Sequence, residues 1–507
     1  MKKRLATSQI MNGAAISYAS IIIGIGCALI YTPWMKNKIG DANYGLYSLV
    51  TTLISIFLMD FGLSSSVNRF VAKYRAEKNE KKVEDVLGYI FKLYIALDIV
   101  IAFFLLIVFF FIDKIYVGLS AAEIGTLKSV YIVVGTYSIA AFPFMPLSGI
   151  LGAYEHFVEL KLLDLCNKLL SVFLIVMALL LNGNIISLVV ANAIAGMVVI
   201  ALKLYVVHRR IGIKPNYSVK NPELLKQLFS FSIWVTVLSF GQRLVFNITP
   251  SILGITANSI EIARFAPASQ LEGYFFTFAY AINGLFLPTV ARYDAKTDSD
   301  SILKLAKKVG KYQISVLGLL YVGIAVVGSK FMHLWMGVEY EIAGLCTLLM
   351  VTPNLIQYPQ QIFNTLLTVR GLVKYQAIAA VTMGIVNLVF SFFLSPRFGV
   401  VGASVSILIA ACVNLLLLNI VYRRKLNIRL RGFYKSVYAR SILSIMVSIL
   451  ISVLLIRQFN FQGWSGFTVD AVMVATIYAV CTFGISLTGD ERKAVIRKVK
   501  LKLGKTV

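Results

Sequence analysis

The sequence predicts an all-α integral membrane protein with about fourteen transmembrane helices. Long apolar stretches alternate with short polar gaps along the 507 residues, of which 58% are hydrophobic and 14% charged. Each apolar stretch is close to the ~20 residues that a helix needs to cross the hydrocarbon core of a bilayer. The basic residues also gather in every second gap, as in chains that cross a membrane repeatedly.

The expected spans follow one another closely, and the gaps leave no room for a large soluble domain. The first stretch is too long for the core of a signal peptide, so we expect it to be retained as a helix. In chain order, the expected spans are 10–34, 45–66, 87–111, 127–152, 158–181, 184–206, 225–247, 262–290, 309–329, 340–366, 372–395, 399–421, 438–456 and 466–488.

The distribution of Lys and Arg identifies the cytoplasmic side. One set of gaps, together with both termini, holds 38 of the 49 basic residues, whereas the alternate gaps hold 7. By the positive-inside rule, both termini are cytoplasmic and the number of spans is even. The net charge of +26 therefore reflects topology, and we expect no nucleic-acid partner. The basic gaps are 67–86, 153–161, 203–226, 292–312, 367–374 and 422–440.

Cysteine and histidine give no sign of a metal site or an active site. The cysteines all fall inside expected spans without metal-binding spacing, which favours free buried thiols. The three histidines are scattered, and no nucleophile is placed beside a base. We therefore expect a protein that is not an enzyme and has neither metal nor cofactor. The cysteines are Cys27, Cys166, Cys346, Cys412 and Cys481.

The two halves of the chain repeat each other weakly. Thr32-Pro33 recurs as Thr249-Pro250, and Val71-Ala72-Lys73-Tyr74 recurs as Val290-Ala291-Arg292-Tyr293. An offset that spans six helices returns each repeat in the same orientation, which is a common plan for transporters. We expect an N-lobe (1–215) and a C-lobe (216–430) as parallel copies, followed by two helices and a basic tail (431–507).

Three segments carry a resemblance to a known family. The run from Asp60 to Tyr74 resembles the end of the second helix in polysaccharide flippases, with its Asp-x-Gly-Leu stretch, basic-aromatic pair and charged loop. The run from Phe286 to Tyr293 resembles the ending of their eighth helix, and 399–404 resembles the Gly-rich start of their twelfth. The whole chain is thus similar to the polysaccharide and O-antigen repeat-unit flippases of the multidrug/oligosaccharidyl-lipid/polysaccharide (MOP) exporter superfamily.

The resemblance implies a multi-pass protein of the bacterial cytoplasmic (inner) membrane. Its expected substrate is an undecaprenyl-pyrophosphate-linked oligosaccharide, such as a repeat unit of O-antigen, capsule or exopolysaccharide, flipped by alternating access. Expected partners are this lipid-linked oligosaccharide, the phospholipid bilayer, and a polysaccharide polymerase or assembly proteins.

Three alternatives remain open at this point. A lipid II flippase usually carries an arginine-rich first helix, whereas residues 10–34 contain no arginine. A cation-coupled multidrug exporter would need an acidic cavity, because its substrates are typically cationic. A membrane glycan polymerase would show a long outward loop or carboxylates in a soluble segment.

Cations inside expected spans are candidates for binding the pyrophosphate, because an ionised side chain at a helix centre costs about 2.5–3.5 kcal/mol. Arg243 offers a planar fork suited to phosphate oxygens, and Asn247 lies one turn further on the same face. Arg264 and Lys92 are further candidates, although Glu261 could neutralise Arg264. Asp164 and Lys168 have the spacing of a structural i,i+4 pair.

Uncharged polar residues in the tenth expected span are candidates for binding sugar hydroxyls. They include Asn354 and Gln357, which could equally serve hydrogen bonds between helices. Three carboxylates are candidates for proton coupling, namely Asp60, Asp98 and Glu272, although each could instead balance a nearby cation, as Arg69 could for Asp60.

Overall fold

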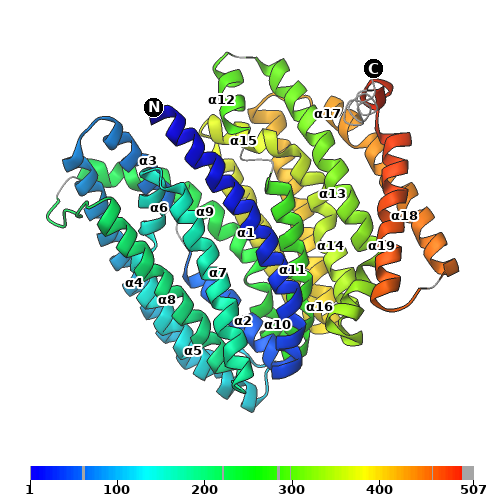
Figure 1. The fold of residues 1–507 in the computed structure, drawn as a ribbon, viewed down its shortest axis with the longest axis horizontal. Coiled ribbons are helices and arrows are strands. Elements are labelled where there is room, and N and C mark those ends of the chain that lie inside the picture. The colour runs from blue at the N-terminus through cyan, green and yellow to red at the C-terminus, as the bar shows by residue number, and fades with distance from the viewer. Residues whose placement is uncertain are drawn as a thin grey trace. The chain divides into compact units, whose positions relative to one another are not determined.

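The computed structural model describes residues 2–59, 63–219, 222–281, 286–296, 298–459 and 461–493. The regular structure of these residues is helical, and the chain divides into two compact units, residues 1–266 (unit 1) and 267–507 (unit 2). Figure 1 labels the helices. The expected all-α fold class is confirmed.

Unit 1 consists of long helices joined by short turns. Local sequence explains several helix ends: Ser120 and Glu123 form a reciprocal capping box at the start of α5, and Asn184 caps α8. The elements are α1 (Lys2–Ile39), α2 (Asp41–Phe57), α3 (Leu63–Ala76), α4 (Glu80–Ile115), α5 (Ala121–Ala141), η1 (Phe142–Phe144), α6 (Pro146–Ala153), α7 (Phe157–Leu180), α8 (Ile185–Arg210), α9 (Pro222–Phe246), α10 (Thr249–Thr256) and the first part of α11 (Ser259–Ala281).

Unit 2 continues with α11 and is organised around the long helix α13. Its further elements are α12 (Leu287–Ala295), α13 (Ser299–Met336), η3 (Val338–Tyr340), α14 (Glu341–Gln357), η4 (Tyr358–Gln360), α15 (Gln361–Val369), α16 (Val373–Lys425), α17 (Leu430–Val437), α18 (Ala439–Phe459), α19 (Gly463–Cys481) and η5 (Thr482–Ser486).

Proline interrupts helices in both units. Pro143 and Pro146 occupy the break from α5 to α6, Pro250 begins α10, and Pro359 lies in η4 between α14 and α15. Proline has no N–H for the helix ladder, so nearby carbonyl groups need other donors. In unit 2, Tyr438 supplies one of these donors, since its hydroxyl donates to the main-chain oxygen of Ile356 at 2.6 Å.

The helix α16 is a hairpin. A straight helix of its 53 residues would be roughly 80 Å long, far beyond the thickness of a bilayer. At Gly399 the backbone has φ 53° and ψ −133°, a conformation that glycine adopts readily. Nζ of Lys425, near the end of α16, lies 5.2 Å from the ring centroid of Tyr375, near its start. The two arms therefore run antiparallel and coincide with the expected spans 372–395 and 399–421.

Within the described residues, nine helical segments are long and apolar enough to cross a membrane. The count of fourteen stays a prediction. Two expected spans share α16, whereas four others coincide with helices outside these nine segments: α2 and α14 have 17 residues each, and α9 and α11 have 25 and 23. Those four are 45–66, 225–247, 262–290 and 340–366.

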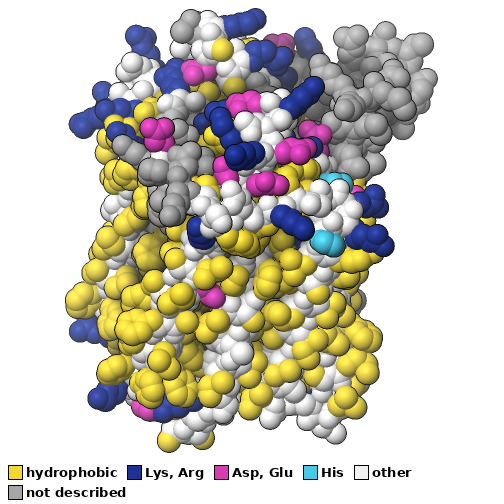
Figure 2. Space-filling view, turned by 90° about the vertical axis from the view of Figure 1, so that its left-hand side faces the viewer, with side chains coloured by type: hydrophobic (Ala, Val, Ile, Leu, Met, Phe, Trp, Pro, Cys, Tyr) yellow, Lys and Arg dark blue, Asp and Glu magenta, His cyan; other side chains and the backbone are white. Residues whose placement is uncertain are grey.

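The surface matches a bilayer environment. Figure 2 shows one face on which hydrophobic side chains gather over the lower and middle part, whereas Lys and Arg gather mainly at the top, with a few near the bottom. On α4 the exposed side chains include Phe103 (61%) and Phe110 (69%). Large aromatic side chains exposed to this degree are more stable in contact with lipid than in contact with water.

Candidate functional site

Arg243 lies in the last turn of α9 and holds the end of α2. Its Nη1 donates to the main-chain oxygen of Ser55 and to Oγ of Ser55, the latter at 2.7 Å. Ser55 belongs to the last turn of α2, where main-chain carbonyl groups have no donor within the helix. A guanidinium at a helix C-terminus satisfies such groups and complements the helix dipole. Arg243 thus has a structural contact beside its expected binding role.

Asn247 follows Arg243 by one turn, in the break between α9 and α10. Its main-chain N–H donates to the main-chain oxygen of Arg243 at 3.0 Å, and its side chain is half-buried. The structure therefore brings these two expected site residues together at a helix interruption. Such interruptions in membrane helices are tolerated where they are buried in protein or line a wet cavity.

Arg264 forms the ion pair with Glu261 that their spacing allows. Its Nη1 lies 2.7 Å from Oε1 of Glu261, with the two side chains 29% and 16% exposed. Asn258 fixes the same turn by accepting a hydrogen bond from the main-chain N–H of Glu261 at 3.0 Å. A phosphate ligand would have to compete with a carboxylate that is already in place.

Lys92 and Asp164 are placed differently from the other charges. Lys92 lies on an exposed side of α4. Asp164 pairs with Lys203 of α8 at 3.2 Å and with Lys161 at 3.7 Å, rather than with Lys168. The expected i,i+4 pair is therefore wrong, because Lys203 reaches Asp164 across the interface of α7 and α8. Nζ of Lys168 instead lies against α1.

Glu272 of α11 and Asn354 of α14 meet inside unit 2. Nδ2 of Asn354 donates to Oε1 of Glu272 at 3.1 Å, and the two residues are 4% and 5% exposed. Gln357 follows by one turn, and its buried Oε1 has no hydrogen-bond partner among the described residues. The ring of Tyr358 packs at 5.8 Å from that of Tyr280. Amides beside aromatic rings are a common lining for ligand sites.

The two remaining coupling candidates lie in unit 1. Asp98 of α4 is 9% exposed, and its Oδ1 has no hydrogen-bond partner within the part of the chain that the structure describes. Asp60 lies outside the described residues. Among those residues, no group of three or more His, Cys, Asp or Glu side chains could hold a metal ion.

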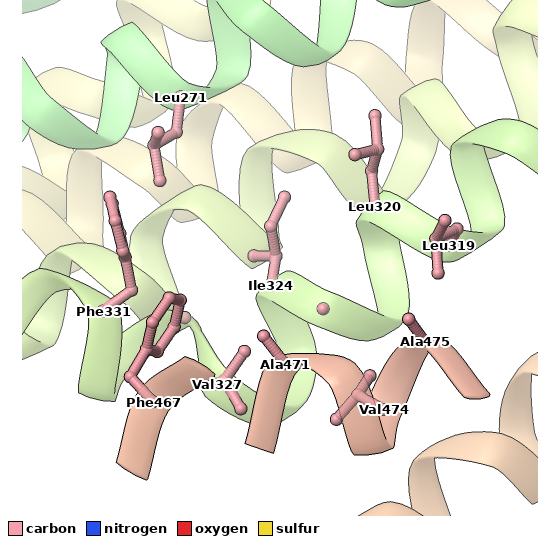
Figure 3. A pocket seen from close by; sticks show the side chains of 12 residues that line it. Leu271, Leu319, Leu320, Ile324, Val327, Phe331, Phe467, Ala471, Val474 and Ala475 are labelled. Atoms are coloured by element: carbon pink, nitrogen blue, oxygen red, sulfur yellow. The ribbon is translucent and has the colours of Figure 1, made fainter. Parts of the chain in front are cut away.

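An apolar cavity of about 330 Å³ lies in unit 2 between α13 and α19. Figure 3 shows Leu320, Ile324 and Phe331 of α13 on one side and Phe467, Ala471 and Val474 of α19 on the other. Leu271 of α11 completes the wall. A cavity with this lining suits a hydrocarbon chain rather than a sugar or a phosphate.

A buried ion pair joins the same two helices. Nζ of Lys330 on α13 lies 2.5 Å from Oδ2 of Asp470 on α19, and Asp470 is fully buried. Sequence reasoning missed this pair, although a lone Asp inside the last expected span was a signal for it. It also missed Ser55 and Lys203, whose roles depend on contacts between helices.

Comparison with known proteins places the chain in a family. A family model described as polysaccharide biosynthesis protein matches residues 10–294, more than half of the chain. The chain is 21% identical over 504 residues to an uncharacterized membrane protein, EpsK, of Bacillus subtilis, and the match covers 95% of this chain and 96% of that protein.

Solved structures show the same fold. One is the lipid II flippase MurJ in an inward closed conformation, with a TM-score of 0.68, 15% identity, and coverage of 93% of this chain and 97% of that one. Another is an inward-facing multidrug resistance MATE family transporter of the MOP superfamily, with a TM-score of 0.65, 11% identity, and coverage of 83% and 99%. The chain therefore belongs to the polysaccharide biosynthesis protein family and has the fold of MOP flippases and transporters.

Proposed function

We propose that this protein flips an undecaprenyl-pyrophosphate-linked oligosaccharide from the cytoplasmic to the outer leaflet of the bacterial cytoplasmic membrane. The family match to polysaccharide biosynthesis proteins supports a glycan substrate, and the fold resembles that of a lipid II flippase. The observation that carries the proposal is the position of Arg243 in the last turn of α9, beside the interruption between α9 and α10.

A pyrophosphate that leaves the head-group region loses hydration, so fixed donors must replace it. A guanidinium has five N–H donors and a planar fork that matches phosphate oxygens. Arg243 can keep its contact with Ser55 through Nη1 and exchange other contacts for the substrate. Asn247, one turn away, adds an amide beside the same break. Arg264 and Lys92 are secondary candidates for the pyrophosphate.

The sugars and the prenyl chain of the substrate need other contacts than the pyrophosphate does. Asn354 and Gln357 in unit 2 would offer amide groups to the sugar hydroxyls. The apolar cavity between α13 and α19 would take a section of the prenyl chain, since its walls are hydrocarbon. We propose that the N-lobe (1–215) and C-lobe (216–430) move against each other to alternate access, with both termini cytoplasmic.

Two alternatives within the same fold stay open. A lipid II flippase is favoured by the similarity to MurJ, and a cation-coupled multidrug exporter by the similarity to a MATE transporter. The absence of arginine from residues 10–34 and the polysaccharide family match favour the repeat-unit substrate over both.

Transport by the purified protein would separate these functions. Vesicles containing a prenyl-pyrophosphate-linked oligosaccharide, lipid II or a cationic dye would be compared, and an impermeant glycosidase or quencher would report translocation. We expect the oligosaccharide lipid to be flipped in preference to the other two. Translocation of lipid II alone, or of the dye alone, would replace the proposal with the corresponding alternative.

A further inference from the structure

Asp98 of α4 and Ser138 of α5 occupy the same layer of unit 1. The ring of Tyr94 packs 5.2 Å from that of Phe142, and the hydroxyl of Tyr131 donates to the main-chain oxygen of Leu105 at 3.2 Å. These two contacts fix the antiparallel register of the helices. Asp98 is four residues after Tyr94 and seven before Leu105, and Ser138 is four before Phe142 and seven after Tyr131. This register places the two residues at the same level of the interface between α4 and α5, between the two contacts.

Each of the two side chains has a buried oxygen without a hydrogen-bond partner among the described residues. Asp98 is 9% exposed and Ser138 is fully buried, yet neither Oδ1 of Asp98 nor Oγ of Ser138 has a hydrogen-bond partner among the described residues. Many serine and threonine side chains of this protein bond a main-chain oxygen of their own helix, as Ser129 does with Gly125. Ser138 does not make such a bond, which leaves its hydroxyl available to a ligand.

Charged groups on the neighbouring elements are engaged elsewhere. The elements with the most extensive contacts to α4 are α3, α5 and η1, and Asn216 bonds Glu84 and Asp85 near the start of α4. On α5, the hydroxyl of Tyr137 lies against Gly196 of α8, and Lys128 pairs with Asp113 at the far end of α4. On α4 itself, Lys92 lies on an exposed side. The basic groups of α3 lie beside aromatic rings near the basic gap 67–86, namely Arg69 at Phe70, Lys73 at Tyr74 and Arg75 at Tyr154.

The carboxyl group of Asp98 and the hydroxyl group of Ser138 indicate which ligand this pair binds. One carboxyl group and one hydroxyl are too few oxygens for a metal ion, which takes six or so. An ionised carboxylate in the middle of a membrane helix without a cation is costly, whereas a protonated carboxyl can donate to a hydroxyl. A proton needs only one oxygen, and it can come from water and return to water when the site is wetted.

We propose that Asp98 and Ser138 form a proton-binding site inside unit 1. The carboxyl of Asp98 is protonated while the site is dry, and a small rotation of the two side chains lets it form a hydrogen bond with the hydroxyl of Ser138. The proton is released when a rearrangement of α4 and α5 admits water. Coupling of this step to transport rests on the proposed function, but proton binding itself does not.

Infrared spectroscopy of the purified protein in lipid tests the site directly. We expect a carbonyl band of a protonated carboxyl at neutral pH that is lost in Asp98→Asn, a nearly isosteric neutral variant. In Ser138→Ala the band should persist and shift to higher wavenumber, because the carboxyl loses its hydroxyl partner. Asp113→Asn is the matched control on the same helix, since Asp113 pairs with Lys128 at 2.5 Å, and this variant should leave the protonated-carboxyl band unchanged.

The result that would overturn the proposal is a spectrum in which Asp98→Asn removes no protonated-carboxyl band. If Asp98→Asn cannot be produced, an unshifted band in Ser138→Ala contradicts the proposal equally. Transport supplies a separate readout: Asp98→Asn should flatten the pH dependence of flipping. If the infrared bands change as expected but the protein transports no substrate, the proton site is supported and only the proposed function is contradicted.

Discussion

Asn354 donates through Nδ2 to Oε1 of Glu272 at 3.1 Å, and this bond joins α14 to α11 inside unit 2. Both residues are almost fully buried. A buried carboxyl that loses its donor has no water to replace it, so the stability of this contact depends on both partners. Substitutions of these two residues should therefore have coupled effects on the free energy of unfolding.

Asn354→Ala should lower the free energy of unfolding by about 1–3 kcal/mol, because the carboxyl of Glu272 is left without that donor. Combining it with Glu272→Leu should recover part of this loss, since the buried polar group is then gone. Thermal unfolding of the detergent-solubilised single and double variants measures the coupling. Strictly additive losses would mean that the two side chains do not act as a pair.

The ion pair between Lys330 and Asp470 should matter more. Lys330→Met leaves the fully buried Asp470 without its cation, and breaking a buried pair costs about 3–5 kcal/mol. The double variant with Asp470→Leu should restore much of the stability. Lys128→Met is the matched control, because its partner Asp113 is 53% exposed and such pairs contribute about 0–1 kcal/mol. Equal losses for Lys330→Met and Lys128→Met would contradict the structure.

Arg243→Ala should abolish glycan export while the protein remains inserted and abundant. Arg243→Lys should restore export only in part, because lysine presents a point charge instead of a fork. Ser55→Ala is a useful control, since it removes the Oγ contact and keeps the main-chain acceptor. Export by cells and abundance by immunoblot would be measured together. Normal export by a stable Arg243→Ala variant would remove Arg243 from the site.

Filling the apolar cavity should impair handling of the lipid chain. Gly323 lines the cavity, and a Cβ atom added there meets no other atom within 4 Å. Gly323→Leu should therefore fold normally and reduce flipping of a long-chain prenyl substrate more than that of a short-chain analogue. Gly125→Leu, at an exposed position that also has nothing within 4 Å, is the control. An equal effect on both chain lengths would argue against a prenyl site there.

Cysteine labelling tests the orientation of the chain. In a cysteine-free background, Cys at Lys78, in the gap 67–86, should be shielded from an impermeant thiol reagent in intact cells. Cys at Asn37 should react, because it lies in an alternate gap at the end of α1. Labelling of position 78 from outside would invert the predicted topology.

The sequence by itself determined the all-α fold class and the long apolar helices, because apolar length is a property of consecutive residues. It also determined local pairs such as Arg264 with Glu261, since helix geometry alone brings residues three apart together. Proline alone does not determine a break: the chain is interrupted at Pro143, Pro250 and Pro359, whereas α1, α11 and α14 continue through Pro33, Pro267 and Pro353.

Tertiary structure decided which charges and polar groups meet across helices. Asp164 pairs with Lys203 instead of Lys168, and Glu272 meets Asn354 across 82 residues of sequence. The layer that holds Asp98 and Ser138 likewise depends on how α4 and α5 are aligned. Such contacts depend on the register and rotation of packed helices, which side-chain packing sets and which no spacing along one helix encodes.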